Sequence, residues 1–463
     1  MSLSSYLKTN SFNEIEGHEI MIKRNFYIIV FIVIIAISGI SSTLIIYFVP
    51  FSIPPGPFIE WRKTWGGSDN DILHEMVVDS TGYFYIAGET WSYGNGSSDL
   101  LLVKMNETFS QYTTWGGAES EIFNGMVFDS NENIYITGST SSYGAGEDDV
   151  VLLKYSKNLV LEWYRIWGEN SSDSCLGIAI DSLDNIYVAG ITNSPNYDVF
   201  LAKYNHSGSL QWNRTWNTED NNITEKVSSI VIDSSDQIFL GVNTNVTGEE
   251  WFILKYDSSG ILLLNTSYSK YIPIEFLVLD SLDNLYAVGS NNDTYLTKFD
   301  NYGSIEWNFT CIQNILRGTE VLAIDPSDNI YIAGTELINV SVILYGHNIS
   351  DYDTYLMKFN ASGTLDWNRT LLGNNRYPEI LEFDFLGNVY LGGSLEMIAT
   401  KDLNVFIIIF DSSGNPLRNT GGGWDGDAYV IGIYAESPQS FFVAENTPRF
   451  EGWDYEIILT KYL

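Results

Sequence analysis

The chain has 463 residues, of which 45% are apolar and 14% aromatic, so it is long enough to bury a large core. Aspartate and glutamate number 58 against 23 lysines and arginines, which gives a formal net charge of −35. Such a surface repels nucleic acid phosphates, and nucleic acid is therefore excluded as a partner.

The first recognisable element is an apolar segment at residues 26–49, "FYIIVFIVIIAISGISSTLIIYFV", which contains no charged residue. It is long enough to cross a lipid bilayer as a helix. Lys23 and Arg24 precede it and no basic cluster follows, so the positive-inside rule predicts that residues 1–25 are cytoplasmic and that the chain continues outside the cell.

A cleaved signal peptide is the alternative reading of this segment. Its apolar region would normally be shorter, and a preceding stretch of 25 residues is long for a signal peptide. We therefore expect an uncleaved, single-pass anchor in the cell membrane. The proline-rich residues 50–57, "PFSIPPGP", would then form a stiff linker between the lipid bilayer and a domain at residues 58–463.

A repeat fills the rest of the chain. An acidic residue before a turn recurs every 45 to 59 residues, at Asp79, Asp129, Asp181, Asp233, Asp280, Asp325, Asp384 and Glu436. Each copy contains four short runs with alternating or β-branched residues, for example "GIAID", "IYVAG", "DVFLAKY" and "LQWNRTW". Clusters of Asp, Asn, Ser and Gly separate the runs, and this pattern predicts four strands joined by hairpin turns.

Four antiparallel strands in each repeat are typical of a β-propeller blade. One such sheet cannot bury both of its faces, whereas a closed ring of stacked sheets can. We predict an all-β fold with a single propeller of eight four-stranded blades. Seven blades are the alternative, because the fifth copy is short and the eighth is degenerate.

The two ends of the repeat region predict how the ring closes. Residues 58–65, "FIEWRKTW", look like a fourth strand, whereas residues 455–463, "YEIILTKYL", look like a third strand. The last blade therefore lacks an outer strand that the start of the domain can supply. We expect the N-terminal and C-terminal strands to pair and complete the eighth blade.

The repeats resemble the SBBP-type β-propeller repeat family. The shared patterns are "VDS-x-G/D-N-x-Y-x-x-G", "D-x-x-L/V-x-K-Y/F" and "G-x-L-x-W…W-G-G", clearest at residues 79–104, 129–154 and 181–203. The resemblance covers residues 61–463, but Ile409 takes the place of the Lys and Glu445 that of the Gly in the last two copies. It implies an extracytoplasmic propeller, often part of a larger surface protein, and no shared catalytic residues.

Residues that recur in every copy are expected to be structural. A carboxylate that opens a turn accepts hydrogen bonds from backbone amides two residues further on, which is the role expected for the seven turn aspartates. The recurrent lysines follow an acid by five residues, as in Asp99 and Lys104, and this odd separation places the two on opposite faces of a strand. We therefore expect each lysine to contact a neighbouring blade. The two cysteines, Cys175 and Cys311, fall in non-adjacent repeats and are expected to be free, buried thiols.

Loop lengths distinguish the two faces of the ring. The turns after the first and third strands are short, whereas the connections after the second and fourth strands are long, and we call these the short-turn face and the long-loop face. Variable loops on a rigid scaffold often carry binding sites. Candidate ligand-binding aromatics on the long-loop face are Trp91, Tyr93, Tyr143, Tyr197, Trp251 and Trp453.

Carboxylates on the same loops are the candidate metal ligands. These are Asp99, Asp148, Glu249 and Asp353, and Ca²⁺ is the only cofactor we expect them to be able to hold. The largest insertion, residues 336–352, is also placed on this face. Ordinary exposed loops of an acidic protein would look the same, and that alternative stays open. Candidate glycosylation sites are Asn95, Asn106 and Asn348, each in an N-x-Ser/Thr motif.

The function predicted from these features is a membrane-anchored binding module that recognises a protein or glycan at the cell surface. No unrepeated set of catalytic residues is readable, so binding is preferred to catalysis. A hydrolase or lyase acting on polysaccharide is one alternative, because paired carboxylates could perform acid/base chemistry. A purely structural component of the cell envelope is the other.

Overall fold

The computed structural model describes residues 59–463 except 194–196, 219–222, 246–249, 270–272, 292, 312–318, 345–346, 373–374, 397–402, 423–426 and 449–454. Residues Pro57–Leu463 form one compact unit. The predicted cytoplasmic segment, membrane helix and linker, residues 1–57, lie outside the described residues. Within the described ranges, no helix is both long and apolar enough to span a bilayer.

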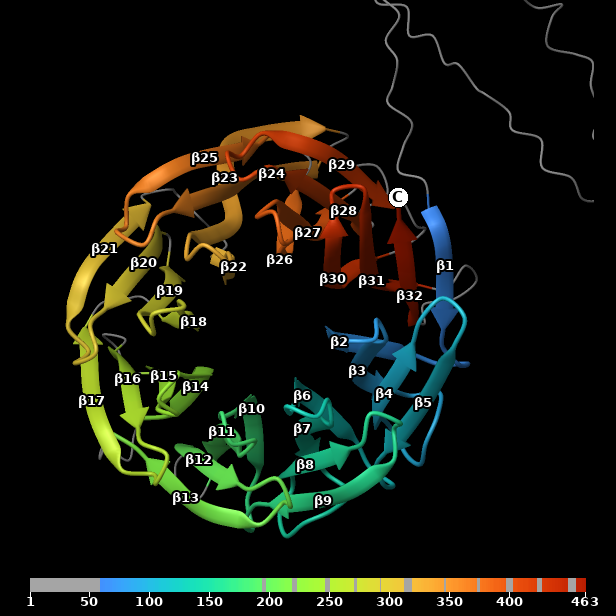
Figure 1. The fold of residues 1–463 in the computed structure, drawn as a ribbon, viewed down its shortest axis with the longest axis vertical. Coiled ribbons are helices and arrows are strands. Elements are labelled where there is room, and N and C mark those ends of the chain that lie inside the picture. Colours follow the sequence, from blue (N-terminus) through green and yellow to red (C-terminus); the bar gives the residue numbers. More distant parts are fainter. Residues whose placement is uncertain are drawn as a thin grey trace, which may run out of the picture. The chain divides into compact units, whose positions relative to one another are not determined.

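The domain is a ring of eight blades, each a four-stranded antiparallel sheet. Figure 1 shows the first strand of each blade nearest the centre of the ring and the fourth strand at the rim. The prediction of an all-β propeller with eight blades is confirmed, and the seven-blade alternative is wrong. The short fifth repeat and the degenerate eighth repeat both form complete sheets.

The first half of the ring contains four blades of consecutive strands. Blade 1 contains β2 (Asp71–Val78), β3 (Phe84–Thr90), β4 (Asp99–Met105) and β5 (Ser110–Trp115). Blade 2 contains β6 (Glu121–Phe128), β7 (Ile134–Thr140), β8 (Asp149–Tyr155) and β9 (Leu161–Trp167). Blade 3 contains β10 (Asp173–Ile180), β11 (Ile186–Thr192), β12 (Asp198–Tyr204) and β13 (Leu210–Trp216). Blade 4 contains β14 (Glu225–Ile232), β15 (Ile238–Thr244), β16 (Glu250–Tyr256) and β17 (Leu262–Ser269).

The second half completes the ring. Blade 5 contains β18 (Ile274–Leu279), β19 (Leu285–Asn291), β20 (Asp293–Phe299) and β21 (Ile305–Cys311). Blade 6 contains β22 (Thr319–Ile324), β23 (Ile330–Leu344), β24 (His347–Phe359) and β25 (Leu365–Leu371). Blade 7 contains β26 (Arg376–Phe383), β27 (Val389–Glu396), β28 (Leu403–Phe410) and β29 (Pro416–Gly422). Blade 8 contains β30 (Tyr429–Ser437), β31 (Ser440–Pro448), β32 (Tyr455–Tyr462) and β1 (Ile59–Trp65).

Burial explains why the second and third runs of each repeat are almost continuously apolar. Strands β7 and β8 are buried along their whole lengths, because sheets cover both of their faces. The outer strand β9 contains only exposed and half-buried residues, since only one of its faces meets a neighbouring blade. The core is therefore a set of apolar layers between blades, such as that formed by Leu102 of blade 1 with Met126 and Ile136 of blade 2.

The large insertion at residues 336–352 is not a loop. It extends β23 and β24 into one long hairpin, with Glu336 opposite Asp353 and Ile338 opposite Asp351. The polar and β-branched residues of this segment are compatible with a loop, but the two strands stay paired as far as Leu344 opposite His347.

Strand β1 pairs with β32, from Ile59 opposite Tyr462 to Trp65 opposite Ile457. The first strand of the domain is thus the outer strand of blade 8 (Figure 1). A side-chain hydrogen bond from Arg62 Nε to Thr460 Oγ1, 3.1 Å long, lies across the same pair of strands.

Candidate functional site

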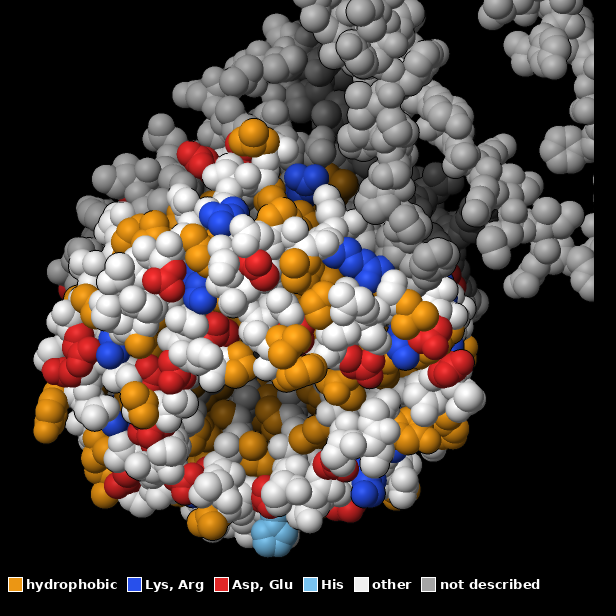
Figure 2. Space-filling model, turned by 45° about the horizontal axis from the view of Figure 1, so that its top comes forward, with side chains coloured by type: hydrophobic (Ala, Val, Ile, Leu, Met, Phe, Trp, Pro, Cys, Tyr) orange, Lys and Arg blue, Asp and Glu red, His pale blue; other side chains and the backbone are white. Residues whose placement is uncertain are grey.

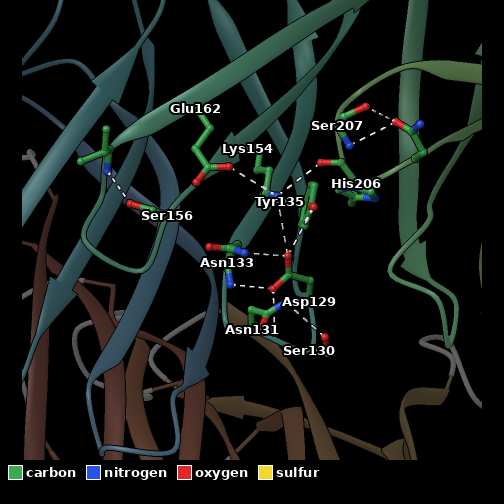
Figure 3. A network of polar contacts seen from close by, with 12 residues as sticks. Asp129, Ser130, Asn131, Asn133, Tyr135, Lys154, Ser156, Glu162, His206 and Ser207 are labelled. Carbon is green, nitrogen blue, oxygen red and sulfur yellow. Dashed lines mark hydrogen bonds and ion pairs between the residues drawn. The ribbon is translucent and has the colours of Figure 1, made fainter.

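The turn aspartates fold their own hairpins. Figure 3 shows Asp129, whose Oδ1 accepts hydrogen bonds from the backbone amides of Asn131 at 2.9 Å and Asn133 at 2.8 Å. Its Oδ2 accepts the Tyr135 hydroxyl at 3.4 Å. The same pair of backbone amides is bound by Asp79, Asp181, Asp233, Asp280, Asp325 and Asp384.

The recurrent lysines join each hairpin to the next blade. Lys154 Nζ lies 3.8 Å from Asp129 Oδ2 and donates a 3.3 Å hydrogen bond to the carbonyl of His206 in blade 3 (Figure 3). The ammonium group also lies over the Tyr135 ring, 5.2 Å from its centroid. The sequence analysis predicts that the lysine contacts a neighbouring blade, but it does not predict that the turn acid is its ion-pair partner. Lys154 comes close to Asp129 because it lies opposite Tyr135 in the sheet, and the Tyr135 hydroxyl bonds Asp129.

In several repeats a second aspartate stands three residues after the turn aspartate, as Asp184 follows Asp181, and it binds the preceding blade. Asp184 has a φ of 59° and accepts hydrogen bonds from Ser130 of blade 2. Equivalent contacts join Ser182 to Asp236, Ser234 to Asp283 and Ser281 to Asp328. These carboxylates of the short-turn face thus have backbone and hydroxyl partners that make them part of the scaffold.

The boundary between blades 4 and 5, which we call the 4–5 seam, departs from its neighbours. In the two preceding seams, an aromatic residue that ends an outer strand packs on a third-strand aromatic of the next blade. The ring centroids are 4.1 Å apart for Trp167 and Phe200 and 4.9 Å apart for Trp216 and Phe252. At the 4–5 seam, Tyr268 stacks on Trp251 of its own blade, with the ring centroids 4.2 Å apart, and also packs on Phe299 of blade 5 at 5.3 Å.

This change leaves a cavity of about 310 Å³, which we call the 4–5 cleft. Its lining includes Trp251, Tyr268, Tyr295, Thr297, Ile305 and Asn308. Ile305 is 44% exposed and Asn308 is also exposed, so the cleft opens at the rim of the ring. Burial raises the pKa of Tyr295, whose hydroxyl donates a 3.4 Å hydrogen bond to Asp293 Oδ2.

A second hollow lies at the centre of the ring, where Figure 2 shows hydrophobic side chains on the wall. The first strands, which lie nearest this centre, carry glutamates with unusual ionisation. Burial raises the pKa of Glu75, Glu275 and Glu379 to about 7. Two of them bond the backbone of the next blade, Glu75 to the Met126 amide at 2.8 Å and Glu379 to the Val430 amide at 2.9 Å.

Comparison with known families identifies the repeat. A family described as SBBP, a beta-propeller repeat, matches residues 110–144 and 162–198. Both matches include a turn aspartate and the strand that follows it, Asp129 with β7 and Asp181 with β11. The chain carries SBBP β-propeller repeats.

The chain is similar to solved structures of low sequence identity, and the fold of this SBBP propeller is shared with one of them. The Dos1 propeller aligns over 87% of this chain and 94% of its own, with 10% identity and a TM-score of 0.53. A catalytically inactive virginiamycin B lyase from Staphylococcus aureus, solved with quinupristin, aligns over 74% of this chain and 95% of its own, with 13% identity and a TM-score of 0.46. No curated protein matches the chain by sequence.

The predicted aromatics of the long-loop face do not form one site in the SBBP propeller. Trp91, Tyr143 and Tyr197 are each more than 40% exposed but belong to three successive blades. Tyr93 packs on Trp65, with the ring centroids 5.3 Å apart. Trp251 is only 9% exposed and is the one described member of the set that lines the 4–5 cleft, and Trp453 lies outside the described residues.

The predicted metal ligands are not brought together either. Asp99, Asp148 and Asp353 stand in blades 1, 2 and 6, and Glu249 lies outside the described residues. Asp148 accepts hydrogen bonds from the hydroxyls of Ser141 and Ser172. In the part of the chain that the structure describes, no three His, Cys, Asp or Glu side chains converge on a metal position. The three described acids of this set therefore do not converge, because each is placed by its own blade.

The glycosylation candidates occupy different settings. Asn95 is exposed in the loop before β4. Asn106 shapes the turn between β4 and β5, where its Oδ1 accepts the backbone amides of Thr108 at 3.1 Å and Phe109 at 2.9 Å. The side chain of Asn348 lies outside the described residues.

The cleft residues Tyr268, Tyr295 and Asn308 are absent from the sequence-based candidates. A signal for the first was available, because the fourth run of this repeat ends in Tyr268 where the two preceding repeats have Trp167 and Trp216. The cleft itself depends on how two blades pack, which the sequence of either blade alone does not show.

Proposed function

We propose that this protein is a membrane-anchored, extracytoplasmic binding module that recognises a glycan in the 4–5 cleft. The observation that carries the proposal is the cleft itself, which lies where Tyr268 stacks on Trp251 of its own blade as well as packing on Phe299 of blade 5. Its volume of about 310 Å³ falls within the range of about 300–1,000 Å³ usual for ligand pockets.

The lining suits a sugar ring. Tyr268 and Tyr295 line the cleft with aromatic rings, and Trp251 stacks on Tyr268 and is largely buried. Aromatic faces pack favourably on the C–H surfaces of other groups. Thr297 and Asn308 add a hydroxyl and an amide, the few placed polar groups that fix the orientation of a ligand. The exposed position of Ile305 and Asn308 would allow a longer glycan to extend along the rim.

The location remains part of the proposal. It is supported by the uncharged segment at residues 26–49, by Lys23 and Arg24 before it, and by the N-x-Ser/Thr motifs in the domain. Binding is favoured over catalysis because the turn carboxylates hold the fold together, as their backbone hydrogen bonds indicate. A polysaccharide-acting enzyme is the alternative, and release of reducing or unsaturated ends from envelope polysaccharides would identify it.

A glycan array probed with the purified chain tests the proposal, with Ile305→Trp as the blocking variant. Ile305 is at the mouth of the cleft, so a larger side chain there should obstruct the cleft without removing core contacts. Leu365→Trp is the matched control, because Leu365 has the same register in blade 6, opposite Phe359 as Ile305 is opposite Phe299. We expect at least a tenfold loss of glycan binding in the first variant and none in the second. Equal binding by both variants would refute the cleft as the site.

A further inference from the structure

Two buried carboxylates of adjacent blades meet in the seam between blades 2 and 3. Asp149 begins β8 and Asp173 begins β10, and they are 1% and 0% exposed. A Cβ atom added to Gly168 would touch oxygens of both carboxylates, so the two groups approach the same point beside this glycine. Within the described part of the chain, neither carboxylate forms an ion pair.

Each carboxylate has only half of its acceptors used. Asp149 Oδ2 accepts the backbone amides of Ala145 at 2.9 Å and Gly146 at 3.1 Å, and Asp173 Oδ2 accepts the amide of Glu169 at 2.7 Å. The Oδ1 atoms of Asp149 and Asp173 are buried without a hydrogen-bond partner, and so is the hydroxyl of Ser171. A buried acceptor left without a partner is costly, which points to a group that the two carboxylates would bind beside Gly168.

Some equivalent positions in the ring have partners within the protein, although Glu225, the counterpart of Asp173 in blade 4, also has a buried Oε2 atom without a hydrogen-bond partner. Asp71, the counterpart of Asp173 in blade 1, accepts hydrogen bonds from Thr90, Ser92 and Gly67. In the next seam, Asn217 occupies the place of Gly168 and donates its amide to Asp198 at 3.1 Å. The seam between blades 2 and 3 has neither arrangement, because glycine provides space but no donor.

We propose that Asp149 and Asp173 bind one Ca²⁺ ion in this seam, with further oxygens from the surrounding loops. Two carboxylates match the charge of a divalent cation, whereas leaving both ionised and unpaired in a buried seam would be strongly unfavourable. Ca²⁺ accepts six to eight oxygens, including carbonyls and hydroxyls. The carbonyls of Glu169 and Ser171 lie against Gly146, beside the amides that bind Asp149.

Oxygen ligands from two facing loops would be arranged irregularly around the ion. Such an arrangement suits Ca²⁺ better than Mg²⁺, which demands near-octahedral geometry.

Calorimetric titration of the chelator-stripped full chain with CaCl₂ tests the site, alongside thermal melting. We expect a dissociation constant of about 10⁻⁴ to 10⁻³ M, as in extracellular modules, and an upward shift in melting temperature of about 2 °C in excess Ca²⁺. Asp173→Asn should lose one equivalent of bound Ca²⁺ and show no such shift. In chelator alone, it should melt at or above the wild-type temperature, because the new amide can donate to Asp149 as Asn217 donates to Asp198.

Asp71→Asn is the matched control, because Asp71 has the same register, is equally buried and is fully hydrogen-bonded. This variant should be less stable with and without Ca²⁺ and should keep the full equivalent of bound ion. Two outcomes would overturn the proposal. One is the same Ca²⁺ stoichiometry in wild type and Asp173→Asn. The other is no Ca²⁺ binding by the wild type.

Discussion

Asp184 of blade 3 accepts two hydrogen bonds from Ser130 of blade 2, one from the backbone amide at 2.9 Å and one from the hydroxyl at 2.7 Å. Because Asp184 has a φ of 59°, Asp184→Ala would lose both bonds and place alanine in a left-handed conformation. We predict a loss of about 1–3 kcal/mol in the free energy of unfolding, measured by urea denaturation.

Two further variants separate the causes of this loss. Asp184→Asn keeps a side chain that tolerates the left-handed region and should cost less than Asp184→Ala. Ser130→Ala removes only the hydroxyl bond and should cost about 0.5–1.5 kcal/mol. An Asp184→Ala protein as stable as the wild type would show that this contact does not hold the blades together.

The lysine that joins blades 2 and 3 gives a larger predicted effect. Lys154→Met would leave the buried Asp129 carboxylate without its cation and remove the hydrogen bond to the His206 carbonyl. Breaking a buried pair by removing one partner costs about 3–5 kcal/mol. Lys157→Met, which removes an exposed positive charge from the adjacent turn, is the control and should change stability by less than about 0.5 kcal/mol. Equal effects in urea denaturation would contradict the structural role of Lys154.

Stability should increase as the pH falls from about 7 towards 5. Glu75, Glu275 and Glu379 have a pKa raised by burial to about 7 from an ordinary value of 4.5, so the folded state holds more protons than the unfolded state in this range. The free energy of unfolding therefore falls as the pH rises through the same window. Thermal melting between pH 4 and pH 8 measures this slope.

The turn acids limit this gain at low pH. Burial opposes ionisation of Asp79, but hydrogen bonds from Thr81 and Tyr83 outweigh burial and lower its pKa below the ordinary 3.8. Its contribution is lost only as the pH falls below about 4, so we expect a maximum near pH 5. Glu75→Gln and Glu379→Gln should flatten the slope between pH 5 and 7, and exposed Glu107→Gln should not. A melting temperature that rises with pH across this interval would be the opposite of the expected result.

Asn106 connects the glycosylation prediction to turn geometry. The equivalent turns of blades 4 and 7 use Asp257 and Asp411, whose Oδ1 atoms accept the same kind of backbone amide. Asn106→Asp should therefore leave stability within about 0.5 kcal/mol of wild type, whereas Asn106→Ala should cost about 1 kcal/mol. Mass spectrometry of the native protein and Asn106→Asp would show whether this asparagine carries a glycan. A destabilised Asn106→Asp protein would contradict the turn account.

The sequence predicts the blades well because each repeat is a local pattern. The turn acid, the tyrosine six residues later and the lysine of the third strand lie in one hairpin sheet, as Asp129, Tyr135 and Lys154 show. Strand order within a blade follows from short turns, and the number of blades follows from counting repeats.

Contacts between blades could not be predicted in the same way. Tyr268 and Tyr295 approach the same cleft from two repeats, and Asp149 faces Asp173 across another seam. These contacts depend on the angle and spacing of neighbouring sheets, which a single repeat does not encode. The long connection before Trp251 predicts that this residue belongs to the long-loop face, yet Trp251 is buried because it stacks on Tyr268.

The central structural claim is that the eight blades form one ring closed by β1 on β32. Hydrogen exchange in the β32 amides, compared between the full chain and a chain lacking residues 58–65, tests this claim most directly. Without β1, strand β32 becomes the exposed edge of blade 8, so the amides that face β1 should exchange at least tenfold faster. Unchanged protection in β32 would contradict closure of the ring by these two strands.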